Sequence, residues 1–236
     1  MNGTLFLVPN LLGLVLPESV LPTGTIATAR GLVHWVVETP KAARAFLKTL
    51  ELPQPISTLD IREIGDAPSP AHLDALLAPA RAGRDIGVLS DAGCPGIADP
   101  GAVVVAAAHA TGVRVAPLVG PSAVLLALMA SGMNGQSFAF HGYLPVKPDI
   151  RAQRLRALDD SVARTGETQI FIETPYRNDA MTGAVLEHCR PATRFCIAAD
   201  LTLPAEFIVS RPVSAWRKAP LLTLDKRPAL FLLGRA

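Results

Sequence analysis

The sequence has little net charge, few cysteines and no long apolar run, and each of these shortages excludes a class of protein. Its 22 lysine and arginine residues against 20 aspartate and glutamate residues give a net charge of +2. That charge is too small for a strong general attraction to nucleic acid or anionic membranes, although it allows a local basic patch. The three cysteines form an odd set without metal-like spacing. They exclude a disulfide-stapled scaffold and a metal site, and favour a reducing cytoplasm.

Membrane and export signals are also scarce. No stretch of 18 residues is free of charges and helix breakers, so no transmembrane helix is expected. The apolar run 5–16 resembles the core of a signal peptide, but no lysine or arginine precedes it, and Pro9 and Asn10 interrupt it. We therefore expect this run to begin with a buried strand over Thr4–Val8, in a cytoplasmic protein.

Short apolar runs of β type alternate with alanine- and leucine-rich runs in a chain that is half apolar and only 18% charged. Its length suffices for two domains of about 100 to 120 residues each. Repetition of strand, helix and strand is typical of a mostly parallel sheet with helices on its faces. We predict an α/β protein with domains 1–117 and 118–236. The second should hold a mixed sheet, since its last three strands follow one another with no clear helix between them.

The predicted elements can be given by residue. Strands are expected over Thr4–Val8, 33–38, Ile86–Leu89, Arg114–Pro117, 138–141, 169–173, 195–198, 207–210 and 229–233. Helices are expected over 41–50, 71–82, Gly101–Ala110, 122–130, 151–164 and Asn178–His188. Ser69-Pro70 should start the second helix and Pro79 should kink or end it. Asp99 should cap the third helix, and Gly132 should close the fourth.

The segment 88–101 carries the most chemical information. A buried strand runs into a loop with three glycines, two prolines and two aspartates before the next helix. Ligands of open α/β sheets bind beyond the carboxyl ends of strands, and glycines let the backbone approach them closely. The loop lacks the G-K-[ST] and G-x-G-x-x-G patterns of phosphate and dinucleotide loops. Carboxylates instead suit ribose hydroxyls or an amine, and we assign that role to Asp91.

A second loop over 117–123 follows the next strand and should lie beside the first. By itself it indicates only a tight turn and a helix start. Two such loops one strand apart, at the expected domain boundary, indicate a shared ligand site.

At these loops a family resemblance emerges. The motif S-D-A-G-T-P-x-I-x-D-P-G is matched over 90–101 with Cys94 for threonine, and P-G-P-[CS]-A over 119–123 with Val119 for proline. F-x-G-F-L-P is matched over 140–145, and F-Y-E-S-P-x-R over 171–177. The sequence resembles the tetrapyrrole methylase superfamily, the class III S-adenosylmethionine-dependent methyltransferases. Within it, the sequence is similar to the ribosomal RNA small subunit methyltransferase I family.

The departures from that family affect its substrate half. Leu14 stands where the family has asparagine, and Ala199 and Leu203 stand at two basic positions. The motifs end before the family's C-terminal extension, so the sequence resembles a shorter branch.

The resemblance implies two α/β domains with S-adenosylmethionine in the cleft between them, and a homodimer. The cofactor residues that it implies are Pro9, Asp91, Ala92, Gly93, Cys94, Ile97, Ser122, Ala123 and Ile172. Cys94 is expected to be a small packing residue there.

Methyl transfer to a hydroxyl requires a base, and two strand-end carboxylates are candidates. Glu38 is the first, with the alternative that it is the N-cap or a first-turn charge of the following helix. Glu173 is the second, with the alternative of a structural ion pair to Arg177 four residues on.

Three functions remain open. The favoured one is 2′-O-methylation of ribosomal RNA, in which Lys147 and the arginines at 151, 154 and 156 would contact phosphates, unless they form a solvated helix face. The second is methylation of a small molecule, such as a tetrapyrrole. The third is a decayed member that binds the cofactor without turnover.

Overall fold

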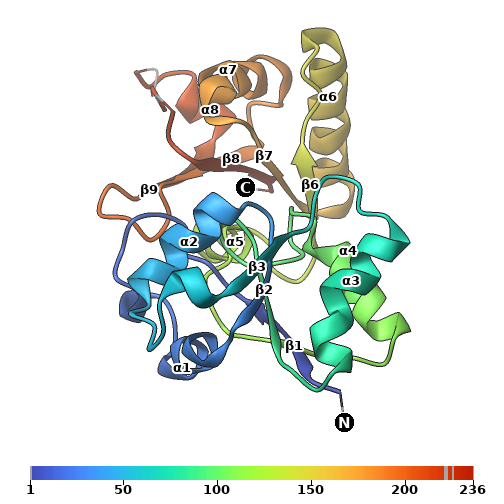
Figure 1. Cartoon of the computed structure of the whole chain (residues 1–236). Helices are drawn as coiled ribbons and strands as arrows, with labels where there is room; N and C mark the ends of the chain where they lie inside the picture. Colours follow the sequence, from blue (N-terminus) through green and yellow to red (C-terminus); the bar gives the residue numbers. More distant parts are fainter. Residues whose placement is uncertain (1, 221–222, 225, 236) are drawn as a thin grey trace. The chain divides into compact units, whose positions relative to one another are not determined.

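Two separate sheets divide the chain into two units, Met1–Ser122 and Ala123–Ala236 (Figure 1). The computed structural model describes residues 2–220, 223–224 and 226–235. The prediction of two α/β domains is confirmed. The sequence places the boundary after residue 117, whereas the units divide after Ser122, so the loop that follows the fifth strand belongs to the first unit.

The first unit is a parallel sheet with helices between its strands. The strand order is β3-β2-β4-β1-β5, and every pairing is parallel. The strands are β1 (Thr4–Val8), β2 (His34–Val37), β3 (Asp60–Glu63), β4 (Ile86–Leu89) and β5 (Arg114–Pro117). The helices are α1 (Thr23–Gly31), α2 (Pro40–Thr49), α3 (Pro70–Arg81) and α4 (Gly101–Ala110).

Helices cover both faces of this sheet, because its central strands are apolar on both sides. One core joins α1 and α2 to Val37 and Leu89, and the other joins α3 and α4 to Val36 and Val88. Neighbouring valines of one strand thus enter opposite cores, as the period of two requires.

The second unit holds a mixed sheet, as predicted, and its five strands lie in the order β6-β7-β10-β8-β9. Among the strand pairs of the described residues, only β6 and β7 are parallel. Its core includes Phe171, Phe195 and Phe231, with Trp216 against Phe195. The strands are β6 (Phe138–Tyr143), β7 (Thr168–Ile172), β8 (Arg194–Ala199), β9 (Phe207–Pro212) and β10 (Ala229–Gly234). The helices are α5 (Ala123–Ser131), α6 (Pro148–Thr165), α7 (Asn178–His188) and α8 (Val213–Trp216).

All predicted strands and helices are present, with ends that differ by at most three residues. Three elements were missed: α1, β3 and the short α8, which contradicts the expectation of no helix among the last strands. Single-turn 3₁₀ helices at Pro17–Ser19, Ile56–Thr58 and Pro175–Arg177 were not predicted either.

Most of the predicted helix ends are confirmed. The Ser69 side chain accepts a hydrogen bond from the His72 amide, and Gly132 follows α5 with φ of +70°. Pro79 does not end the helix at its own position, because α3 continues to Arg81. Pro79 lies in the last turn, where the carbonyl that its missing N–H would bind belongs to Ala75. Arg62 Nη1 donates to that oxygen at 3.1 Å, which compensates for the lost helix bond.

Candidate functional site

The strand order creates a topological switch point in the first unit. The chain leaves β1 toward β2 and leaves β4 toward β5, although β1 and β4 are neighbours in the sheet. The connection after β1 leads to α1 and the connection after β4 leads to α4, and these two helices pack on opposite faces of the sheet, which leaves a crevice at the carboxyl ends of the two strands. Crevices of this kind are where open α/β sheets bind ligands.

Asn10 ties the two loops together at this point. Its amide donates to the Gly93 carbonyl at 2.8 Å. Its side-chain Nδ2 donates to the carbonyls of Ser90 and Asp91, both at 2.9 Å. Asn10 is buried, so these bonds fix the loop after β4 against the loop after β1. From the sequence, Asn10 is only an interruption of an apolar run, and its role in joining the loops was not predicted.

Glu38 and Asp91 meet across the neighbouring strands β2 and β4. The Asp91 amide donates to Glu38 Oε2 at 2.9 Å. Asp91 Oδ1 accepts from the amide and hydroxyl of Thr39, at 3.1 and 2.9 Å. Asp91 is an exposed residue, and its other carboxylate oxygen, Oδ2, has no hydrogen-bond partner in the described part of the chain. One carboxylate oxygen is thus used for structure and the other is free to bind a ligand.

The pKa of Glu38 is raised above its ordinary value. Partial burial is the main cause, and the carboxylates of Asp91 and Asp99 add repulsion. The hydrogen bond from the Asp91 amide opposes these effects. The alternative that Glu38 caps the next helix is not what the structure shows, because Thr39 is the cap of α2. A carboxyl group with a raised pKa at the edge of a ligand site suits the role of a base.

Asp99 folds the rest of the loop. Its Oδ1 accepts from the amides of Gly96 and Gly101, at 2.8 and 2.7 Å. The capping interpretation is therefore partly right: Asp99 binds the first amide of α4, although the cap position is Pro100. Gly93 has φ of +71°, a conformation that favours glycine and lets the backbone turn back on itself.

The loop after β5 packs directly on this structure. A Cβ atom on Gly120 would lie 2.4 Å from Pro9 Cβ, so only glycine permits this approach. The Cys94 thiol donates to the Pro121 carbonyl at 3.4 Å, and burial raises its pKa. Cys94 is thus held as a protonated packing group, consistent with the expected role.

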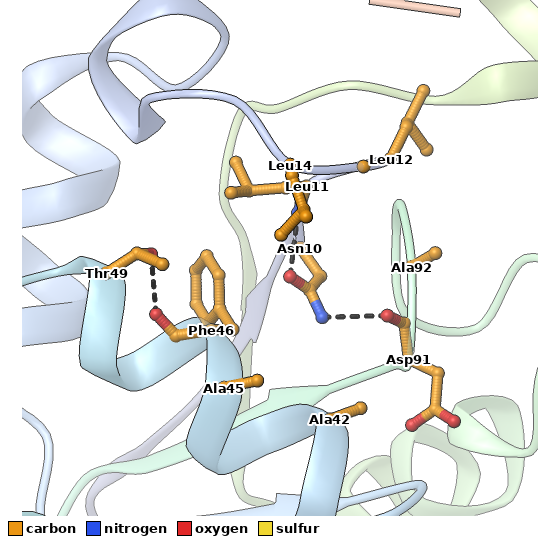
Figure 2. A pocket seen from close by; sticks show the side chains of 11 residues that line it. Asn10, Leu11, Leu12, Leu14, Ala42, Ala45, Phe46, Thr49, Asp91 and Ala92 are labelled. Atoms are coloured by element: carbon orange, nitrogen blue, oxygen red, sulfur yellow. Dashed lines mark hydrogen bonds between the residues drawn. The ribbon is translucent and has the colours of Figure 1, made fainter. Parts of the chain in front are cut away.

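A cavity of about 240 Å³ opens beside these loops (Figure 2). The loop after β1 forms one wall and α2 forms the other, while Asp91 and Ala92 close one side. Its lining residues are Asn10, Leu11, Leu12, Gly13, Leu14, Ala42, Ala45, Phe46, Thr49, Asp91 and Ala92. Of these residues, the sequence analysis had placed Asp91 and Ala92 in a ligand site, whereas the wall formed by α2 was not predicted.

The structure thus brings together Pro9, Glu38, Asp91 and the loops that carry Ile97 and Ser122, all in the first unit. The remaining predicted residues, Ala123, Ile172 and Glu173, belong to the second unit.

Glu173 is engaged in the second unit. Its Oε1 accepts from Arg177 Nη2 at 2.6 Å and from the Thr174 amide at 2.7 Å. Its side chain is fully buried, and Oε2 has no partner among the described residues. The ion pair supports the structural alternative for Glu173 over the role of base.

The predicted basic cluster of α6 is partly occupied. Arg154 donates to His141 Nδ1 at 3.0 Å, and His141 Nε2 lies 2.7 Å from Gln169 Oε1. Arg156 Nη1 lies 3.5 Å from His188 Nδ1. These contacts inside the second unit support a structural role for two of the arginines.

None of the helices in the described ranges is long and apolar enough to cross a membrane. No group of three or more histidine, cysteine, aspartate or glutamate residues in those ranges could hold a metal ion.

Comparison with known proteins agrees with this geometry. Residues 34–215 match the family model of Tetrapyrrole (Corrin/Porphyrin) Methylases. The chain belongs to this family. The solved structure of the methyltransferase CobJ superposes with a TM-score of 0.63 at 22% identity, covering 99% of this chain and 95% of that one. The structure of uroporphyrin-III C-methyl transferase from Thermus thermophilus, complexed with S-adenyl homocysteine, superposes with a TM-score of 0.55 at 20% identity. The match covers 98% of this chain and 97% of that one. Both show the tetrapyrrole methylase fold.

Curated relatives are more similar in sequence. Ribosomal RNA small subunit methyltransferase I of Mesorhizobium japonicum is 41% identical over 127 residues, which are 54% of this chain and 42% of that protein. The protein of the same name from Vibrio cholerae is 37% identical over 132 residues, 56% of this chain and 44% of that protein. The region of this chain that matches spans less than half the length of each of these curated relatives.

Proposed function

We propose that the protein is an S-adenosylmethionine-dependent methyltransferase that methylates a ribose 2′-hydroxyl of small-subunit ribosomal RNA. The observation that carries this proposal is the loop after β4, tied by Asn10 at the switch point, with one free oxygen on Asp91. Membership of the methylase family supports the reaction class, and the curated relatives support the acceptor.

The residues present fit such a cofactor. The free Asp91 oxygen can accept a hydrogen bond from a ribose hydroxyl or an amine. The left-handed turn at Gly93 lets main-chain groups approach a ligand closely. When bound, the sulfonium cofactor supplies a methyl group already activated for in-line transfer, so positioning provides much of the rate. By the same proposal Pro9, Ala92, Cys94, Ile97, Ser122, Ala123 and Ile172 contact it.

Glu38 is the proposed base. Its raised pKa makes it a better proton acceptor than an ordinary carboxylate, and the Asp91 amide fixes one of its oxygens. General base catalysis contributes about 10²- to 10⁴-fold in rate and is most efficient when the pKa of the base lies near the operating pH. Glu173 is retained as a second candidate only because Oε2 is unpartnered among the described residues.

The same proposal includes a homodimer in the cytoplasm, where ribosomes assemble. Methylation of a small molecule, such as a tetrapyrrole, is the second candidate function. It is named because one solved protein with this fold is a uroporphyrin-III C-methyl transferase. A protein that binds the cofactor without turnover is the third.

Calorimetric titration with S-adenosylhomocysteine tests the cofactor site. We expect micromolar binding by the wild-type protein and a loss of at least tenfold in Asp91→Ala. Asp91→Asn keeps an acceptor for Thr39 and removes the charge, so it separates ligand binding from loop support. Asp66→Ala, at an exposed position on another loop, is the matched control and should bind normally. Absence of wild-type binding would contradict the assignment.

The acceptor is tested by mapping ribose methylation of small-subunit RNA in a strain that lacks the gene. A methyl group that disappears, and returns with wild-type protein but not with Glu38→Gln, supports the proposal. An unchanged methylation map rejects ribosomal RNA and leaves the small-molecule reaction.

A further inference from the structure

Helix α2 presents a stripe of small and apolar side chains to the cavity. Ala42, Ala45, Phe46 and Thr49 line it, at the spacing of three, four and seven residues that defines one helix face. Figure 2 shows these side chains directed from α2 toward the loop after β1. Two alanines on this face leave open the space that larger residues would fill.

A second stripe runs along the same helix. Lys41, Arg44 and Lys48 recur at intervals of three and seven residues, one position before Ala42, Ala45 and Thr49. Since each residue turns the helix by about 100°, the basic stripe lies beside the stripe that lines the cavity. All three side chains are exposed, and none has an ion pair or side-chain hydrogen bond within the described ranges. The helix contains no acidic residue.

The interior of the cavity has the opposite character. Leucine, alanine and phenylalanine side chains form most of its wall, and Asp91 is its one charged lining residue. Glu38 lies directly behind Asp91, so the local field repels an anion. An uncharged flat ring fits this apolar wall. About 240 Å³ accommodates one ring system, and falls below the usual range of about 300 to 1,000 Å³ for drug-sized ligands.

We propose that the cavity holds one unstacked nucleobase of a single-stranded RNA and that the basic stripe of α2 contacts the neighbouring phosphates. Single-stranded RNA is recognised in this way, with splayed bases in apolar or aromatic sites and cations along the backbone. A tetrapyrrole has four linked rings and anionic side chains, so it matches neither the size nor the charge of the cavity. The inference rests on the proposed function and names the surface that would bind its acceptor.

The first test fills the cavity. Ala45 is exposed on the lining face, so Ala45→Phe occupies the space without disturbing the core. The probe is a fluorescent ten-nucleotide RNA of mixed sequence, measured by anisotropy with S-adenosylhomocysteine present. We expect about tenfold weaker RNA binding, the usual contribution of one held base, with an unchanged slope of affinity against salt. Ala78→Phe, the same change at an exposed position of α3, is the matched control. Ala42→Leu is a second, milder filling variant.

The second test removes the stripe. Replacement of Lys41, Arg44 and Lys48 by glutamine should weaken RNA binding. The slope of log affinity against log salt should become less steep by about two, since each phosphate contact on single strands contributes about 0.7 to that slope. The control replaces Arg84 and Arg114, which lie at the amino ends of β4 and β5, and should leave the slope unchanged.

Binding is measured without turnover, so the outcomes separate this inference from the proposed function. If wild-type protein binds RNA, and the filling variants lose it, the inference holds even where no RNA is methylated. It is overturned if wild-type protein does not bind the RNA, or if Ala45→Phe and Ala42→Leu bind the RNA as tightly as the wild type. It is equally overturned if Ala45→Phe loses S-adenosylhomocysteine binding, because the cavity then belongs to the cofactor.

Discussion

At the scale of single residues, the reciprocal contacts of Glu38 and Asp91 have a consequence for stability. Burial and two neighbouring carboxylates raise the pKa of Glu38 in the folded protein above its ordinary value of 4.5. At pH values between the ordinary pKa and the raised pKa of Glu38, the folded state binds more protons than the unfolded state. The free energy of unfolding therefore falls as the pH rises through that window. Glu38→Gln keeps an acceptor for the Asp91 amide and removes the charge.

We therefore predict that Glu38→Gln is more stable than the wild type at neutral pH, and that this advantage shrinks as the pH falls through the raised pKa toward 4.5 and is lost below 4.5. Urea unfolding at a series of pH values measures the difference. Glu63→Gln, at an exposed position of the edge strand, is the control. A difference that is constant over the whole pH range would show that the charge of Glu38 is not its cause.

At the scale of elements, α3 depends on a residue from β3. Arg62 donates to the Ala75 carbonyl, which Pro79 leaves without its helix partner. Arg62→Ala should lower the free energy of unfolding by about 1 kcal/mol, since this carbonyl loses its donor. In a Pro79→Ala background the helix supplies its own N–H to this carbonyl, so Arg62→Ala should then lower the free energy of unfolding by less. A double-mutant cycle in urea should give a coupling of about 0.5 kcal/mol or more, and additive effects would reject the connection.

The elements that the sequence failed to predict share a physical cause. α1 contains three threonines and two glycines, which favour the helix weakly, and it forms because Ile26 and Ala29 pack into the core. β3 has the sequence DIRE, with one apolar residue, and exists through its pairing with β2 at the sheet edge. Strands without polar residues, such as β4 with the sequence IGVL, carry their own signal, whereas α1 and β3 depend on neighbours distant in sequence.

The candidate site divides in the same way. The glycine loop and Asp91 could be predicted, because a strand followed by glycines, prolines and carboxylates is a local pattern. Asn10 could not, since its partners at Ser90 and Asp91 are 80 and 81 residues away. The cavity against α2 also depends on this distant pairing. Local pattern thus identifies the chemistry of a loop, and tertiary pairing determines which loops cooperate.

At the scale of the whole molecule, each unit has its own core and its own tryptophan. Trp35 is 1% exposed in the first unit and Trp216 is 4% exposed in the second, and the chain has no other tryptophan. Trp216→Phe therefore leaves a probe of the first unit with its core intact, and Trp35→Phe leaves a probe of the second. Cores that share no residue need not melt together.

We predict that the two single-tryptophan variants unfold in urea with different midpoints, when each is followed by the fluorescence of its remaining tryptophan. Circular dichroism of the wild type should then show a broad transition that spans both. Because the proposed cofactor residues come from both units, S-adenosylhomocysteine should raise both midpoints, and a ligand held by one unit alone should raise only one. Identical midpoints without ligand would mean that the units unfold as one cooperative body. If S-adenosylhomocysteine raises only the unfolding midpoint that Trp35 reports, the cofactor contacts are restricted to the first unit, and Ala123 and Ile172 are removed from the site.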